Sequence, residues 1–313
     1  MSVLGWLGLG KPRAESPAAP AGDDVFGEDF QRRLEALAIA SRRLVSGRTR
    51  AERRSKKTGS GIEFADHREY APGDDFRHLD WKLYGRSERL LLKLFQEEED
   101  LSVYVLLDTS ASMDFGAPPK LAYGKRIAAA LAYVALASLD RVSVLTFADV
   151  IGARLPPTRG KSRIFKVFEF LRGARPGGRT GIEAAMRAFA AQHKRSGVAI
   201  VISDLYDPAG FERGIDALRY ARFEPFVIQL VDPTEARPPL HGDVRLVDRE
   251  TGEVREVTVT PRVLERYAAA HAAYLESIAA YCAQKQVPHL AIETSTPWDE
   301  AVLTVLRRGG LVG

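Results

Sequence analysis

A run of five apolar residues that ends in three oxygen-bearing side chains constrains this chain more than any other stretch. Residues 103–107 read VYVLL and are followed by Asp108, Ser110 and Ser112. An unbroken apolar run of this length is typical of a strand buried within a parallel sheet. Ligands of open α/β sheets bind at the carboxyl ends of such strands. We therefore expect these three side chains to lie at a binding edge.

Helical and strand patterns alternate along the rest of the chain. The expected helices cover residues 119–139, 162–171, 180–194, 211–220, 261–283 and 297–307, and the expected strands cover 142–147, 150–155, 198–203, 225–230 and 287–292. Strands separated by helices imply right-handed crossovers. The predicted fold class is therefore α/β, with a doubly wound and mainly parallel sheet. A β-hairpin is expected as an insertion at 243–258, turning at 250–253.

The chain ahead of this sheet has three predicted parts. Residues 1–24 are rich in Pro, Ala and Gly and predict a flexible tail, while residues 25–45 predict a helix that packs on the body. A basic arm follows at 42–57, and short β-type segments with turn signals at 60–100 predict a small β-rich subdomain. We accordingly divide the chain into 1–24, 25–100 and 101–313, the last being the α/β domain.

Composition sets limits but indicates no function by itself. With 313 residues, 45% of them hydrophobic, the chain can bury a full core. The formal net charge of +4 is too small to specify a partner. Cys282 is the sole cysteine, which excludes an intrachain disulfide and a cysteine-based metal site and fits a reducing compartment. Because Cys282 falls in a helical pattern, we expect it to be a small apolar residue that is buried or half-buried.

Two further residues join the opening motif as candidate cation ligands. Thr180 stands at the start of an expected helix, and Asp204 directly follows the apolar strand expected at 198–203. Together with Asp108, Ser110 and Ser112 they offer two carboxylates and three hydroxyls. Such hard oxygen donors favour Mg²⁺, Mn²⁺ or Ca²⁺ over zinc or copper. The predicted metal site consists of Asp108, Ser110, Ser112, Thr180 and Asp204.

These five positions resemble the metal-ion-dependent adhesion site of von Willebrand factor A domains. The stretch before them is similar to the family known as the domain of unknown function numbered fifty-eight. The residues that carry this second resemblance are Glu63-Phe64, Arg68-x-Tyr70, Pro72-Gly73-Asp74-Asp75, Arg77, Asp80-Trp81 and the run Asp108-Thr109-Ser110-Ala111-Ser112-Met113. The similarity covers most of the chain from about residue 28 onward.

The resemblance implies a metal-bearing interaction domain without catalytic activity. It implies that Ser110, Ser112 and Thr180 bind Mg²⁺ directly or through water, while Asp108 and Asp204 contribute charge and hold coordinated waters. One open position then accepts an acidic residue from a protein partner, which in bacteria is often a MoxR-type AAA+ ATPase. Membrane-anchored members of the family carry transmembrane helices, and the sequence shows no apolar run of the roughly 18 residues that a span needs. We therefore expect a cytoplasmic protein.

Three other interpretations stay open on the sequence alone. Ser and Thr after a strand also cap helices, so the hydroxyls could be structural. Asp108 could be the nucleophile of a metal-dependent phosphatase or hydrolase, although such enzymes usually carry a second Asp where this chain has Ser110. The arm at 42–57 holds eight Lys or Arg against one acid and could bind nucleic acid. It lacks interleaved aromatic residues, which disfavours that function.

Overall fold

The computed structural model describes residues 25–45, 58–59, 63–96 and 101–308. The tail predicted at 1–24 and the side chains of the arm predicted at 42–57 lie outside the described residues. Contacts divide the described part into two compact units. The larger holds residues 25–41 and 101–308, and the smaller holds 42–45, 58–59 and 63–96.

The larger unit is built on a six-stranded sheet. Its strands are β4 (Ser102–Asp108), β5 (Arg141–Phe147), β6 (Ile151–Thr158), β7 (Val198–Ser203), β8 (Glu224–Val231) and β11 (His289–Glu293). They lie in the order β11-β8-β7-β4-β5-β6. All neighbours are parallel except β5 and β6, which form an antiparallel pair. β4, the strand predicted from the opening motif, is central and buried along its whole length.

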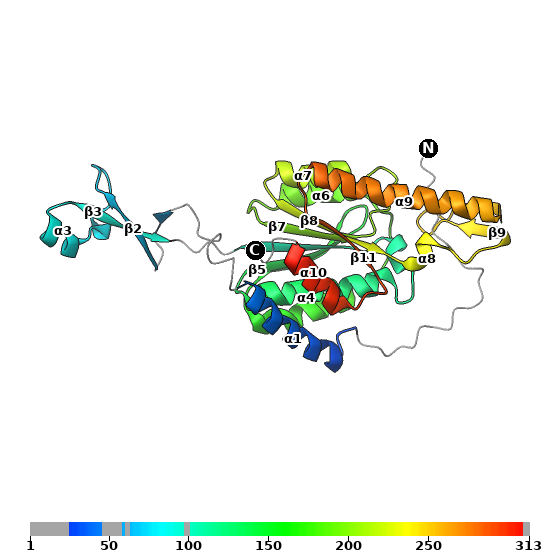
Figure 1. Ribbon diagram of the computed structural model, residues 1–313, viewed down its shortest axis with the longest axis horizontal. Helices are drawn as coiled ribbons and strands as arrows, with labels where there is room; N and C mark the ends of the chain where they lie inside the picture. The colour runs from blue at the N-terminus through cyan, green and yellow to red at the C-terminus, as the bar shows by residue number, and fades with distance from the viewer. Residues whose placement is uncertain (1–24, 46–57, 60–62, 97–100, 309–313) are drawn as a thin grey trace. The chain divides into compact units, whose positions relative to one another are not determined.

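Helices cover both faces of this sheet, which confirms the doubly wound α/β fold (Figure 1). One face carries α6 (Ile182–Gln192), α7 (Glu212–Tyr220) and α9 (Pro261–Gln284). The other carries α4 (Lys120–Ala137), α10 (Trp298–Arg308) and α1 (Glu28–Val45), with α5 (Ile164–Gly173) packed on α4. Among the described helices, none combines the length and the apolar character that crossing a bilayer requires.

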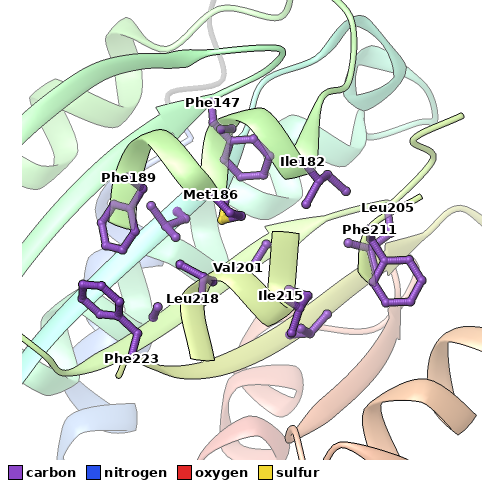
Figure 2. Packing of buried hydrophobic residues seen from close by; sticks show 14 of the residues in the cluster. Phe147, Ile182, Met186, Phe189, Val201, Leu205, Phe211, Ile215, Leu218 and Phe223 are labelled. Atoms are coloured by element: carbon purple, nitrogen blue, oxygen red, sulfur yellow. The ribbon is translucent and has the colours of Figure 1, made fainter. Parts of the chain in front are cut away.

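The alternating side chains of the strands form a hydrophobic core on each face. On the first face, Phe147 of β5 and Val201 of β7 pack with Met186 and Phe189 of α6 (Figure 2). Cys282 of α9 belongs to the same cluster and is buried, as predicted. On the second face, a Cβ at Gly124 would lie 3.1 Å from the Cδ1 atoms of two leucines, one on β4 and one on β8. The glycine thus lets α4 approach the sheet closely.

The N-terminal helix packs on the larger unit, as its apolar face predicts. The Phe26 ring stacks on Phe168 of α5 at a centroid distance of 4.8 Å, and Phe30 lies 4.4 Å from the Trp298 ring of α10. The sequence division placed this helix with residues 46–100. Its aromatic contacts with α5 and α10 instead place residues 25–41 in the larger unit.

The smaller unit contains the predicted β-rich segment and one helix. Its three-stranded antiparallel sheet has the order β1-β3-β2, from β1 (Thr58–Gly59), β3 (Leu91–Gln96) and β2 (Glu63–Glu69). Asp80 caps the helix α3 (Trp81–Ser87) by accepting from two backbone amides. Ion pairs hold its loops, among them Arg68 with Asp74 at 2.8 Å.

The inserted unit is a hairpin of β9 (Gly242–Val247) and β10 (Val254–Val259), close to the predicted 243–258. A short helix, α8 (Pro233–Ala236), precedes it and was not expected from the sequence. Asp232 and Glu235 form a capping box around the first turn of α8. Four residues are too few to produce a helical period in the sequence.

A substitution at Gly214 of α7 can show whether close packing or helix propensity has the larger effect on the free energy of unfolding. A Cβ at this position would lie 2.9 Å from the backbone oxygen of Ile182 in α6. We expect Gly214→Ala to lower the free energy of unfolding by about 1–3 kcal/mol because of overpacking, although alanine is the better helix former. Denaturant unfolding measures the change. Gly173→Ala, at the open end of α5 with no atom within 4 Å, is the control and should be neutral or stabilising; equal effects would contradict the packing argument.

Candidate functional site

The five candidate ligands lie in three segments: the end of β4 and the turn after it, the residue that follows β7, and the loop between α5 and α6. Asp108 is the last residue of β4, and Asp204 directly follows β7, the neighbouring strand. Thr180 lies two residues before α6. Because parallel strands end at one edge, the two carboxylates are brought to the same edge of the sheet.

Backbone hydrogen bonds tie the loops together. The Gly177 amide donates to the Thr109 carbonyl oxygen at 2.8 Å, and the Ala111 amide donates to the Gly178 carbonyl oxygen at 3.1 Å. On the other side, Asp207 accepts from the Ile182 amide at the start of α6 at 2.7 Å. The Thr180 loop is therefore fixed both to the loop after β4 and to the loop after β7.

Asp108 is fully buried and both of its oxygens are engaged. Oδ1 accepts from the Ser110 amide at 2.8 Å, and Oδ2 accepts from the Ser203 hydroxyl at 2.5 Å. Burial and then the nearby Asp204 carboxylate raise the pKa of Asp108 to about 7. Sequence reasoning did not assign Ser203, although a hydroxyl directly before Asp204 was a visible signal.

The hydroxyls of Ser110 and Ser112 lie side by side. Their Oγ atoms are 3.0 Å apart, with Ser110 fully buried and Ser112 half-buried at the start of a short 3₁₀ turn. Two neighbouring ligands of an octahedral Mg²⁺ ion, each at 2.0–2.1 Å, are separated by about 2.9 Å. The observed spacing suits a hydrogen-bonded pair and equally suits two ligands of one small cation.

Asp204 is paired with a buried lysine that the sequence did not predict. Lys120, the first residue of α4, places Nζ 2.7 Å from Asp204 Oδ2 and 2.5 Å from Glu235 Oε1. Burial acts to lower the pKa of Lys120, but the two carboxylates outweigh it and raise that pKa. The ammonium neutralises one of the two carboxylates that it contacts. Asp204 lies 84 positions after Lys120 in the chain, and Glu235 lies 115 positions after it. No pattern in the sequence connects residues so far apart, so only the structure could identify this group of three.

Thr180 also has an unexpected partner, in the turn of the inserted hairpin. Its hydroxyl donates to Glu250 Oε1 at 2.6 Å, and its amide donates to Glu250 Oε2 at 3.1 Å. Partial burial raises the pKa of the Glu250 carboxyl, the two hydrogen bonds oppose that rise, and the Asp204 carboxylate adds to it. The hairpin thus brings a third acidic group to the site.

The residues present fit a hard divalent cation. Within the described ranges, no three His, Cys, Asp or Glu side chains gather closely enough to hold a metal by themselves. A cation at this edge would therefore need the hydroxyl oxygens of Ser110, Ser112 and Thr180. Hydroxyl and carboxylate oxygens are the donors that Mg²⁺ and Ca²⁺ take, and Asp108 and Asp204 supply negative charge beside them.

The family model described as "Protein of unknown function DUF58" matches residues 66–276, which is more than half of the chain. The chain belongs to the DUF58 family. This DUF58 chain is 26% identical over 310 residues to "Uncharacterized protein Rv1480" of Mycobacterium tuberculosis, covering 96% of this chain and 98% of that protein. It is also 32% identical over 140 residues to "Uncharacterized protein MAV169" of Mycobacterium avium, which covers 44% of this chain and 82% of that protein.

Two solved structures resemble this DUF58 chain at low sequence identity. The conserved hypothetical protein BatB from Bacteroides thetaiotaomicron has 17% identity and a TM-score of 0.42, with 68% of this chain and 98% of that chain covered. An aerotolerance-related membrane protein from Bacteroides fragilis has 18% identity and a TM-score of 0.43, with coverages of 67% and 99%.

The buried carboxyl of Asp108 predicts a pH-dependent cost in stability. A carboxyl whose pKa is higher in the folded chain than in the unfolded one binds its proton more tightly when folded, so stability is lost as pH rises through that interval. In chelator, we expect Asp108→Asn to match the wild type near pH 4. The variant should become more stable by roughly 2–4 kcal/mol above pH 7.

Denaturant unfolding at a series of pH values measures this difference. The exposed Asp149→Asn, in the turn between β5 and β6, is the control and should show no such widening gap. A gap between wild type and Asp108→Asn that stays constant from pH 4 to pH 8 would contradict a raised pKa of Asp108.

Proposed function

We propose that this DUF58 protein is a divalent-cation-dependent adaptor, which binds a protein partner through that partner's acidic residue. The observation that carries the proposal is the side-by-side pair of Ser110 and Ser112 hydroxyls, next to the buried carboxyl of Asp108. Asp204 and Thr180 face the same edge from loops that are bonded together. The match to the adhesion-site motif thus coincides with a compatible arrangement of hydroxyl and carboxylate donors.

The neutral and the charged side chains would have different roles at the site. Ser110, Ser112 and Thr180 are neutral donors that would hold the ion, while Asp108 and Asp204 would balance its charge. When bound, Mg²⁺ supplies an electrophilic centre that attracts a carboxylate oxygen of the partner. Because Lys120 already pairs with Asp204, the neutral hydroxyls and Asp108 would be the main donors to the ion, and an open coordination position would accept a carboxylate oxygen of the partner.

A MoxR-type AAA+ ATPase is the partner that we propose. This part rests on the family resemblance, since nucleotide hydrolysis is not expected from the adaptor itself. In that arrangement the ATPase supplies the acidic residue and the energy, and the adaptor supplies the cation. We propose a cytoplasmic location and no enzymatic activity for the adaptor.

A metal-dependent phosphatase is less well supported by the geometry of Asp108. A nucleophilic carboxylate must reach the phosphorus atom, yet Asp108 has no exposed surface and both oxygens accept hydrogen bonds. The structure does not bear on nucleic-acid binding through the arm at 42–57, because the side chains of the arm lie outside the described residues.

Removing one hydroxyl should weaken cation binding without unfolding the protein. We expect Ser110→Ala to lower the affinity for Mg²⁺ and Mn²⁺ at least tenfold in calorimetric titrations, because a direct ligand is lost. Ser277→Ala, a surface serine of α9, is the matched control and should bind like the wild type. Negligible heat in wild type and variants alike would refute the cation site. Phosphatase turnover that disappears in Asp108→Asn would favour the enzyme instead.

Partner binding should depend on the same hydroxyl and on the ion. A purified MoxR-type ATPase from the same source should be captured by the wild type in Mg²⁺. Capture should be lost with chelator and reduced at least tenfold by Ser110→Ala, since the partner's carboxylate would then lack its electrophile. Surface plasmon resonance measures both effects. Capture of the ATPase that survives chelator and Ser110→Ala unchanged would count against a cation-mediated contact.

A further inference from the structure

The turn of the inserted hairpin delivers an acidic side chain to a candidate cation ligand. Asp248 shapes this turn by accepting from the Glu250 and Thr251 amides at 2.8 and 2.7 Å. The turn then points the Glu250 carboxylate at Thr180, which binds both of its oxygens. A residue 70 positions away along the chain is thus held against the site by two hydrogen bonds.

A second contact anchors the same turn to the loop that follows β4. Arg249 donates to the Asp114 carbonyl oxygen at 2.6 Å and lies 3.4 Å from its carboxylate. Asp114 ends the short 3₁₀ turn that begins just after Ser110 and contains Ser112. Adjacent residues of the hairpin therefore contact both loops that carry the three hydroxyls.

Glu250 is a partly buried carboxylate with no positive charge paired to it in the described part of the chain. Among the described residues, the partners found for its carboxylate are the Thr180 hydroxyl and amide. No Lys or Arg in that part of the chain forms an ion pair with it, and the Asp204 carboxylate repels it. A cation bound by the neighbouring hydroxyls would supply the missing charge.

We propose that Glu250 is an in-chain ligand of the cation site, occupying the position that a partner's acidic residue must take. The inference rests on the proposed cation-dependent function. It adds Glu250 as a ligand and a means by which the free protein limits partner binding. A partner's carboxylate then binds by displacing the hairpin, so the free protein is held in a self-occupied state. Glu250 competes at high effective concentration because it is tethered, and only an acid supported by further contacts displaces it.

The hairpin is built in a way that permits such displacement. It is a two-stranded unit that no other described strand extends. Of the residues in β9 and β10, only Leu246 and Val259 are buried. A segment with so few buried apolar contacts opens at low free energy compared with the core.

Mn²⁺ bound to the full chain provides a direct test. Free Mn²⁺ is followed by electron paramagnetic resonance, and water bound to the ion is followed by proton relaxation. We expect Glu250→Ala to bind Mn²⁺ ten- to a hundredfold more weakly and, when saturated, to hold one more fast-exchanging water than the wild type. Acetate should displace that extra water in Glu250→Ala at concentrations that leave the wild type unchanged.

Two variants of the same turn serve as comparisons. Glu253→Ala removes an exposed carboxylate that pairs only with Arg255 in the described contacts, and it should behave like the wild type. Arg249→Ala keeps the carboxylate but removes its anchor, and it should lower Mn²⁺ affinity by a smaller factor. Circular dichroism verifies that all variants are folded.

The outcomes separate this inference from the function on which it rests. If Mn²⁺ binds the wild type and is lost in Ser110→Ala, yet Glu250→Ala keeps the same affinity and water count, the site is real and Glu250 is not its ligand. A weaker affinity without an extra water or an acetate effect would also overturn the proposal, because Glu250 would then be a tether only. If the wild type binds no Mn²⁺, both the cation site and the in-chain ligand are wrong.

Discussion

Two buried carboxylates at the ends of neighbouring parallel strands are the constraint on which the rest of the site depends. Asp108 ends β4 and Asp204 follows β7, so the sheet itself forces them to one edge. Their mutual repulsion in a buried setting must be offset. Hydrogen bonds from Ser203 and Ser110 stabilise the first carboxylate, and the Lys120 ammonium stabilises the second.

This compensation is incomplete, which agrees with the cation site that we propose. Lys120 also pairs with Glu235, so a single ammonium group contacts two carboxylates. Asp108 and Glu250 add further acidic groups to the site. A divalent ion would complete the balance of charge. The carboxylate best placed by sequence to act as a nucleophile is enclosed and fully hydrogen-bonded, whereas the hydroxyls are arranged side by side.

Much of the fold could be read from local patterns. The strand expected at 198–203 coincides with β7, and the helix expected at 261–283 matches α9 to within one residue. These succeeded because burial imposes a period of 2 or 3.6 on the side chains, or an unbroken apolar run on a central strand. The division of the chain was harder to predict. The ring of Phe30 in α1 and that of Phe26 just before it contact the larger unit, and contacts of that kind follow no period.

The sequence by itself determined a doubly wound α/β fold and offered two Asp, two Ser and one Thr as candidate ligands, with the Asp and Ser residues at or just after strand ends. That much follows because strand ends share an edge and the motif is contiguous. Only the tertiary structure decided that Lys120 and Glu235 neutralise part of the site and that Glu250 reaches Thr180. These contacts join loops and helix ends far apart in the chain. Their hydrogen bonds and charges depend on where the whole fold places each atom, which no local pattern of residues records.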